Sequence, residues 1–260
     1  MLIDLRYRIV DVFSDRPLAG NGLCVVLDPA PVDVMQPLAR EVNLSETTYP
    51  VVTGDDAYDV RIFTPNEELP FAGHPSLGTA WVLGENAWTQ RSSGATVTVT
   101  ADATGAVMTQ PDPEFEDLDG ADIVPALGLP GADAVVRAEA AGNTFVFALT
   151  DAPIDDLDPD LPRLVAAGAG MVGVVRRRDD ATLHVRVFAP GAGIAEDPGT
   201  GSAAGPIGLL ARQRWGTGAD VTIHQGAEIG RPCVIEVHAE QGGIRVGGRV
   251  TACAEGRFSW

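Results

Sequence analysis

Residues 70–80 read PFAGHPSLGTA and decide how the first half of this chain folds. Gly73 allows a tight turn and a close approach of the backbone to a ligand. Pro75 suits the first turn of a helix, where its missing N–H costs nothing. The free N–H groups of that turn and the positive end of the helix dipole favour an anion. The stretch therefore predicts a helix that begins beside a carboxylate pocket, with His74 next to it.

A second glycine turn of this kind lies in the other half of the chain. Residues 196–205 read EDPGTGSAAG and run from acidic residues through glycines into a helix of small residues. Glu196 and Asp197 either complement the helix N-terminus or face a bound anion. Ser202 is either a capping hydroxyl or a hydrogen-bond partner of a substrate carboxylate. If the two loops face each other, they form a site for a small acid.

Composition excludes several classes of protein. The chain has 260 residues, 45% of them apolar and 21% charged, which is typical of a globular protein of one large domain or two ordinary ones. The net charge of −18 argues against nucleic-acid binding, which requires a basic surface. No leader pattern or apolar run of membrane-spanning length appears, so we expect a cytoplasmic location and no membrane partner.

The residue types also limit the chemistry. All 18 basic residues are arginine, so neither a lysine Schiff base nor the lysine of a phosphate-binding loop is available. Cys24, Cys233 and Cys253 form no metal or redox motif and are interpreted as small buried apolar residues. The histidines lack the spacing of metal ligands, and His184, which alternates with valines, is interpreted as a sheet-surface residue. We therefore expect no metal.

Hydrophobic periodicity gives the order of the elements. In the first half it predicts strands at 4–13, 23–27, 48–53, 58–64, 95–101 and 105–110, and helices at 34–42, capped by Asp33, and 75–84. In the second half it predicts strands at 134–140, 143–149, 171–177 and 182–189, helices at 159–168 and 202–214, and two or three strands within 220–250. The acidic, proline-containing stretch 111–120 is interpreted as a linker.

Each half thus has several strands and one small-residue helix that follows a glycine turn. We predict an α+β fold of two pseudo-symmetric lobes, residues 1–112 and 113–249, with 250–260 as the segment that would complete the first lobe. Each lobe is expected to be a curved mixed or antiparallel sheet around a central helix, with a cleft between the lobes.

Other glycine motifs carry little weight. Residues 168–173 match G-x-G-x-x-G but follow a helix, the reverse of the dinucleotide-binding context, and are interpreted as a loop. Residues 199–205 lack the strand and acidic partner of a nucleotide unit, which favours a small anion there. No G-x-S-x-G elbow is present, so a serine hydrolase is not expected.

Glu46 is the leading acid–base candidate, within the stretch NLSETT at 43–48. It is either a capping or surface carboxylate in a polar turn, or a general acid/base whose pKa is raised in a closed cleft. Glu67 and Glu68, which precede the first glycine turn, are interpreted as structural.

Five segments together resemble a known family. They occur in the order LAGNGLCVV, NLSETTYP, RIFTPNEELPFAGHPSLGTA, FAPGAGIAEDPGTGSAAG and HQGAEIGRP, and are similar to PhzF-like proteins of phenazine biosynthesis over residues 10–232. The resemblance implies the diaminopimelate epimerase-like fold, with two pseudo-symmetric lobes and the active site between them. It also implies a homodimer that works without a metal or an organic cofactor.

The resemblance assigns roles to residues of this chain. The family's acid/base glutamate corresponds to Glu46, and its other catalytic positions correspond to His74 and Asp197. The substrate-binding positions correspond to Gly73, Gly201 and Ser202.

Two further comparisons with the family bear on the reaction. Neither glycine loop holds the cysteine found in related epimerases, which argues against racemisation by two thiols. Gly22 replaces the family's usual proline, and Gly199 stands where alanine is common. These departures leave the substrate open.

The resemblance implies a cofactor-independent isomerase that moves a proton within a small acid. The best-known family substrate is trans-2,3-dihydro-3-hydroxyanthranilate. Two alternatives stay open: an amino-acid epimerase or dehydratase-like enzyme, and a non-catalytic protein that binds a small acid.

Overall fold

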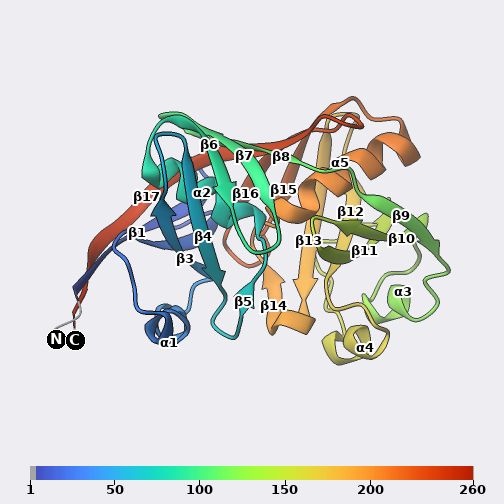
Figure 1. Ribbon diagram of the computed structural model, residues 1–260. Helices are drawn as coiled ribbons and strands as arrows, with labels where there is room; N and C mark the ends of the chain where they lie inside the picture. The colour runs from blue at the N-terminus through green and yellow to red at the C-terminus, as the bar shows by residue number, and fades with distance from the viewer. Residues whose placement is uncertain (1–3, 260) are drawn as a thin grey trace. The chain divides into compact units, whose positions relative to one another are not determined.

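Strands make up most of the fold, and the helices are few, as Figure 1 shows for a computed structural model that describes residues 4–259. The chain divides into two units. Unit 1 comprises Met1–Thr109 with Gly247–Trp260, and unit 2 comprises Gln110–Val246. The mixed α/β content agrees with the predicted fold class.

Unit 1 is built of strands that surround one helix. Its elements are β1 (Asp4–Val12), β2 (Asn21–Val26), α1 (Val32–Val42), β3 (Glu46–Val52), β4 (Ala57–Phe63), β5 (Glu68–Leu69), α2 (Gly73–Leu83), β6 (Asn86–Arg91), β7 (Thr96–Ala101), most of β8 (Gly105–Gln110) and most of β17 (Ile244–Ser259). Pairing runs through β1, β2, β3, β4, β6, β7, β8 and β17 and returns to β1. The strands of unit 1 therefore form a closed circuit.

Helix α2 is the core element of this unit. It contacts β1, β2, β3, β6 and β7, and nearly all of its residues are buried. A helix that is apolar or small on every side is suited to full burial. Gly78 lets it approach the sheet closely: a Cβ there would lie 2.7 Å from Leu23 Cδ2 and 2.8 Å from Val12 Cγ2. The small residues within 70–80 thus allow the start of α2 to lie inside the strands.

Unit 2 repeats the use of a buried helix. Its elements are β9 (Glu114–Leu118), α3 (Ile123–Ala126), β10 (Ala134–Ala140), β11 (Asn143–Thr150), α4 (Leu161–Ala166), β12 (Val172–Arg177), β13 (Thr182–Ala189), β14 (Ile194–Asp197), α5 (Gly201–Trp215), β15 (Asp220–Gln225) and β16 (Cys233–His238). Pairing runs β9–β10–β11–β12–β13–β15–β16, and β11–β12 and β13–β15 are parallel. Helix α5 contacts β10, β11, β12, β15 and β16.

Several sequence predictions are corrected by the structure. The supposed linker contains strand β9, whose residues pair with β10. Asp33 lies in the first turn of α1 and does not cap it, because the helix begins at Val32 and its N-cap position is Pro31. Strand β6 was not predicted, since its sequence NAWTQR is largely polar. The last strand does not end near residue 250 but continues to Ser259, because all of β1 pairs with it.

None of the three cysteines forms a disulfide bond. Cys24 in unit 1 and Cys233 in unit 2 are buried, as predicted, whereas Cys253 is half-buried. Burial raises the pKa of the Cys24 thiol to about 12.

Among the helices of residues 4–259, none combines the length and the apolar character needed to cross a membrane.

Candidate active site

Glu46 begins strand β3 and is only 7% exposed. It pairs with Leu23 of the parallel strand β2, and two buried threonines follow it. The interpretation of Glu46 as a surface carboxylate in a turn is therefore wrong. A buried carboxylate must be balanced by neighbouring polar groups.

His74 provides one of those groups. It is the second residue of α2, it is 4% exposed, and its Nε2 lies 3.1 Å from Glu46 Oε2. Its Nδ1 lies 3.2 Å from Asn21 Nδ2. Either ring nitrogen can carry the proton, and the direction of the bond between Nδ1 and Asn21 follows from which one does.

Burial controls the charge of this histidine. Desolvation lowers the pKa of His74 to about 3, and a hydrogen bond with the Gly22 backbone acts in the opposite direction. The ring is therefore neutral across the physiological range. A neutral imidazole does not act as a cationic acid toward Glu46.

A chain of buried hydrogen bonds fixes the first turn of α2, beside His74. Tyr58 donates to Gln90 Oε1 at 2.7 Å, Gln90 Nε2 donates to Ser76 Oγ at 2.8 Å, and Ser76 Oγ donates to the Ala72 carbonyl at 2.8 Å. None of these side chains was predicted from the sequence. No sequence signal identifies Gln90, because its strand was itself unpredicted.

In unit 2, Asp197 is the last residue of β14 and is 9% exposed. Thr200 Oγ1 donates to Asp197 Oδ2 at 2.5 Å. Gln225, the last residue of β15, donates through Nε2 to the Asp197 carbonyl at 2.8 Å and to Thr200 Oγ1 at 3.0 Å. Gln225 lies within the motif HQGAEIGRP but was not recognised as a positioning residue.

The glycine beside Gln225 permits this arrangement. Gly226 has a φ of +78°, and a Cβ there would lie 2.4 Å from the Pro198 carbonyl oxygen. The turn that carries Gln225 can therefore pack directly on the loop that follows Asp197.

Gly201 and Ser202 begin helix α5. Both lie in its first turn, where backbone N–H groups lack partners within the helix. No side chain caps α5, so the interpretation of Ser202 as a capping hydroxyl is wrong. Gln110 Nε2 donates to the Gly201 carbonyl at 2.9 Å and fixes the start of the helix.

The other acidic candidates have structural partners. Glu196 forms an ion pair with the buried Arg186 at 2.8 Å, and Glu68 forms one with Arg61 at 2.6 Å. His184 lies in a strand as predicted, but it is buried rather than on the sheet surface. Its Nε2 lies 2.7 Å from Glu228 Oε1, and with Asp155 the pair forms a cluster that could hold a metal.

The predicted site residues thus fall into two groups. Gly73, Glu46 and His74 meet in unit 1, whereas Asp197, Gly201 and Ser202 lie close in sequence within unit 2. In unit 1, a buried carboxylate contacts a neutral imidazole at a helix N-terminus. Such a pair is suited to exchanging a proton with a bound acid. The catalytic and binding roles of all six residues stay predictions.

Known proteins match this chain over almost all of its length. The family model of phenazine biosynthesis-like proteins, PhzC-PhzF, matches residues 10–256. A trans-2,3-dihydro-3-hydroxyanthranilate isomerase of Pseudomonas aeruginosa is 37% identical and covers 97% of this chain and 98% of its own.

Solved structures similar to this chain include a member of the same family and a more distant protein that shares the fold. A PhzF-family protein of Enterococcus faecalis has 26% identity and a TM-score of 0.86, and covers 98% of this chain and 99% of its own. A hydroxyproline epimerase of Agrobacterium vitis has 14% identity and a TM-score of 0.63, with coverage of 98% and 91%. The fold is therefore diaminopimelate epimerase-like, as the resemblance implied. The chain itself belongs to the PhzC/PhzF phenazine biosynthesis-like family, and it is an isomerase.

Proposed function

We propose that this isomerase moves a proton within a small carboxylic acid, with Glu46 as the acid/base and without a cofactor. The first substrate to test is trans-2,3-dihydro-3-hydroxyanthranilate, on which the 37% identical Pseudomonas relative acts according to its name. Following the family resemblance, we also propose a homodimer in the cytoplasm.

The observation that carries this proposal is the buried contact of 3.1 Å between Glu46 and His74. Glu46 takes a proton from C3 of the substrate and helps to deliver one elsewhere on the ring. The proton that leaves one carbon is replaced at another, so the reaction requires no co-reactant. His74 stays neutral, and its Nε2, which lies 3.1 Å from Glu46 Oε2, orients the carboxylate. Positioned proton transfer of this kind supplies roughly 10²–10⁴-fold in rate.

The helix N-termini provide the binding groups of the proposal. The N–H groups at Gly73 in α2 and at Gly201 in α5 would receive carboxylate oxygen, because helix N-termini favour anions. Ser202 would add a hydroxyl hydrogen bond. Asp197, held by Thr200 and Gln225, would orient a polar substituent or relay a proton.

The test is proton NMR in D₂O with purified protein and this substrate, beside a panel of small amino acids. We expect conversion with solvent deuterium entering one ring carbon. Glu46→Gln should lower turnover by roughly 10²-fold or more, because the amide cannot accept the proton. Glu68→Gln is the matched control, since Glu68 is paired with Arg61 and is not expected to touch the substrate.

Circular dichroism establishes that both variants remain folded. Near-wild-type turnover by folded Glu46→Gln would refute the assignment of the acid/base. Exchange only at the α-carbon of an amino acid would replace the proposal with an epimerase. A panel acid that binds but stays unchanged for hours would replace it with a binding protein.

A further inference from the structure

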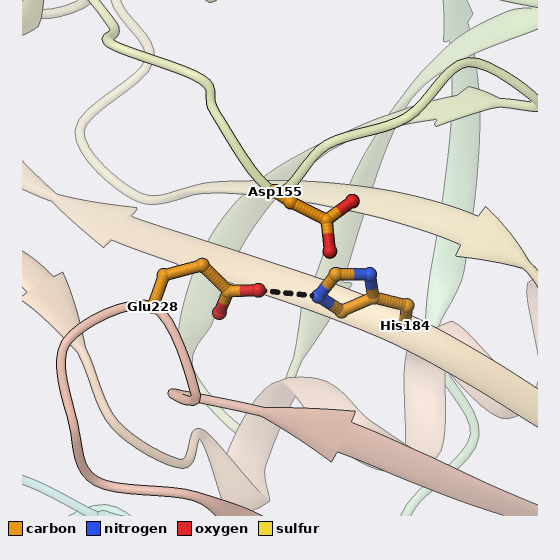
Figure 2. A group of neighbouring side chains, drawn as sticks. All are labelled: Asp155, His184 and Glu228. Atoms are coloured by element: carbon orange, nitrogen blue, oxygen red, sulfur yellow. Dashed lines mark hydrogen bonds and ion pairs between the residues drawn. The ribbon is translucent and has the colours of Figure 1, made fainter.

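A cluster of three ligand-type side chains lies in unit 2, apart from the residues assigned above. Asp155 comes from the loop between β11 and α4, His184 from strand β13, and Glu228 from the turn between β15 and β16 (Figure 2). One ligand atom of each residue lies within 4.8 Å of the other two. Three segments far apart in sequence therefore converge on one point.

The cluster has lone pairs that the protein does not satisfy. His184 is 2% exposed, and its Nε2 contacts Glu228 Oε1 at 2.7 Å. His184 Nδ1 and Glu228 Oε2 are also buried, and neither has a hydrogen-bond partner among residues 4–259. A buried carboxylate oxygen without a donor is costly. Because nothing binds Nδ1, no second hydrogen bond fixes which ring nitrogen carries the proton.

A buried arginine fixes the loop that carries Asp155. Arg186 Nη1 donates to the carbonyls of Ile154, Asp155 and Leu157 at 3.0, 3.2 and 2.9 Å. Its Nε and Nη2 donate to both carboxylate oxygens of Glu196 at 2.9 and 2.8 Å. Glu196 therefore balances the charge of Arg186, and the carboxylates of Asp155 and Glu228 supply a local negative charge.

We propose that Asp155, His184 and Glu228 bind one divalent transition-metal ion. The ion takes the place of the hydrogen between His184 Nε2 and Glu228 Oε1, and the ring keeps its proton on Nδ1. Those two atoms separate from 2.7 Å to about 3.3 Å, the spacing of two ligands at about 2.0–2.1 Å around tetrahedral zinc. Asp155, which is exposed, closes the site from the solvent side.

The donor set decides the class of ion. One imidazole with two carboxylates suits zinc or manganese, whereas magnesium prefers oxygen ligands alone. Arg176 is the β12 register partner of His184, and so brings a positive charge to the same face of the sheet. That charge weakens cation binding, and we expect micromolar rather than tighter affinity for zinc. The ion would join three segments of unit 2.

Calorimetric titration of the full-length protein with zinc chloride, after treatment with EDTA, tests this site. We expect one zinc ion per chain in the wild type and no comparable binding of magnesium. Glu228→Gln and Asp155→Asn should each weaken zinc binding roughly tenfold or more, because each replaces a charged ligand with a neutral amide of similar shape. His238→Gln is the matched control, since His238 also contacts a carboxylate, Asp220, at 2.7 Å.

The outcomes separate the metal site from a plain ion pair. Equal zinc binding by wild type and His238→Gln, with weakening in the two cluster variants, supports the proposal. Absence of zinc binding by the wild type, or undiminished binding by Asp155→Asn and Glu228→Gln, overturns it. If Glu228→Gln does not fold, Asp155→Asn decides alone, because Asp155 is an exposed loop residue.

Discussion

At the scale of single residues, the neutral state of His74 links stability to pH. Burial lowers its pKa in the folded state to about 3, from an ordinary value of 6.5. Between these two values the unfolded chain binds a proton that the folded chain does not, so acid favours unfolding. The contribution of neutral His74 to the free energy of unfolding is fully present above pH 6.5. It is lost as the pH falls toward 3, by at most about 1.4 kcal/mol per pH unit.

Replacing the ring tests that linkage. We expect the free energy of unfolding of the wild type to fall more steeply between pH 6.5 and pH 4 than that of His74→Gln. Guanidinium titrations of both proteins at several pH values measure the difference, in which the shared contribution of the carboxylates cancels. Parallel pH dependences for the two proteins would show that His74 is not held neutral by burial.

Residue positions were predictable where a local backbone signal marks them. Gly73 and His74 lie at the start of a helix as the Gly-His-Pro turn predicted. Gln225 and Gln90 were missed, because their partners depend on which strands pair and in which register. His184 was misplaced for a related reason. Its alternation with valines suggested one exposed face, but β13 is buried on both faces.

At the scale of elements, the packing of α2 against β1 and β2 depends on Gly78. Gly78→Val should destabilise the protein by about 1–3 kcal/mol, because its side chain would overlap Leu23 and Val12. Urea denaturation measures the change. Gly54→Val is the control, since a Cβ at Gly54 meets nothing within 4 Å. Equal stability of wild type and Gly78→Val would mean that α2 can shift freely within its strands.

Elements with strong local signals were predicted and elements defined by pairing were not. Helices α2 and α5 follow glycine turns and contain small residues, which mark them in the sequence. Strand β9 is acidic and mostly exposed, and only its ladder with β10 makes it a strand. Strand β6 likewise depends on β4 and β7. Sequence periodicity carries no information about such partners.

At the scale of the whole molecule, the C-terminal strand completes a unit that begins at the other end of the chain. Strand β17 pairs with β1 from Asp4↔Ser259 to Val12↔Val250, and Phe13 N–H donates to the Arg249 carbonyl at 2.8 Å. Fold class and family were evident from five dispersed motifs. The closed circuit of unit 1 was not, because it depends on pairing across more than 200 residues.

Shortening the chain tests this dependence. In a protein ending at Gly248, we expect the amides of β1 and β2 to lose protection from hydrogen exchange, because β1 loses one of its two partners. Those of β11, β12 and β13 should remain protected by their own ladder. Mass spectrometry measures both sets, and a chain lacking only residues 259–260 is the control. Unchanged protection of β1 and β2 would contradict the prediction.

The placement of the cysteines makes the opening of each unit separately measurable. Cys24 and Cys233 are buried cysteines outside any disulfide bond, one in each unit. At neutral pH almost no Cys24 thiolate exists in the closed state, since its pKa is about 12. An alkylating reagent therefore modifies Cys24 only when unit 1 opens, and Cys233 only when unit 2 does. Peptide-resolved labelling rates in a Cys253→Ser background would give the opening frequency of both units from a single sample.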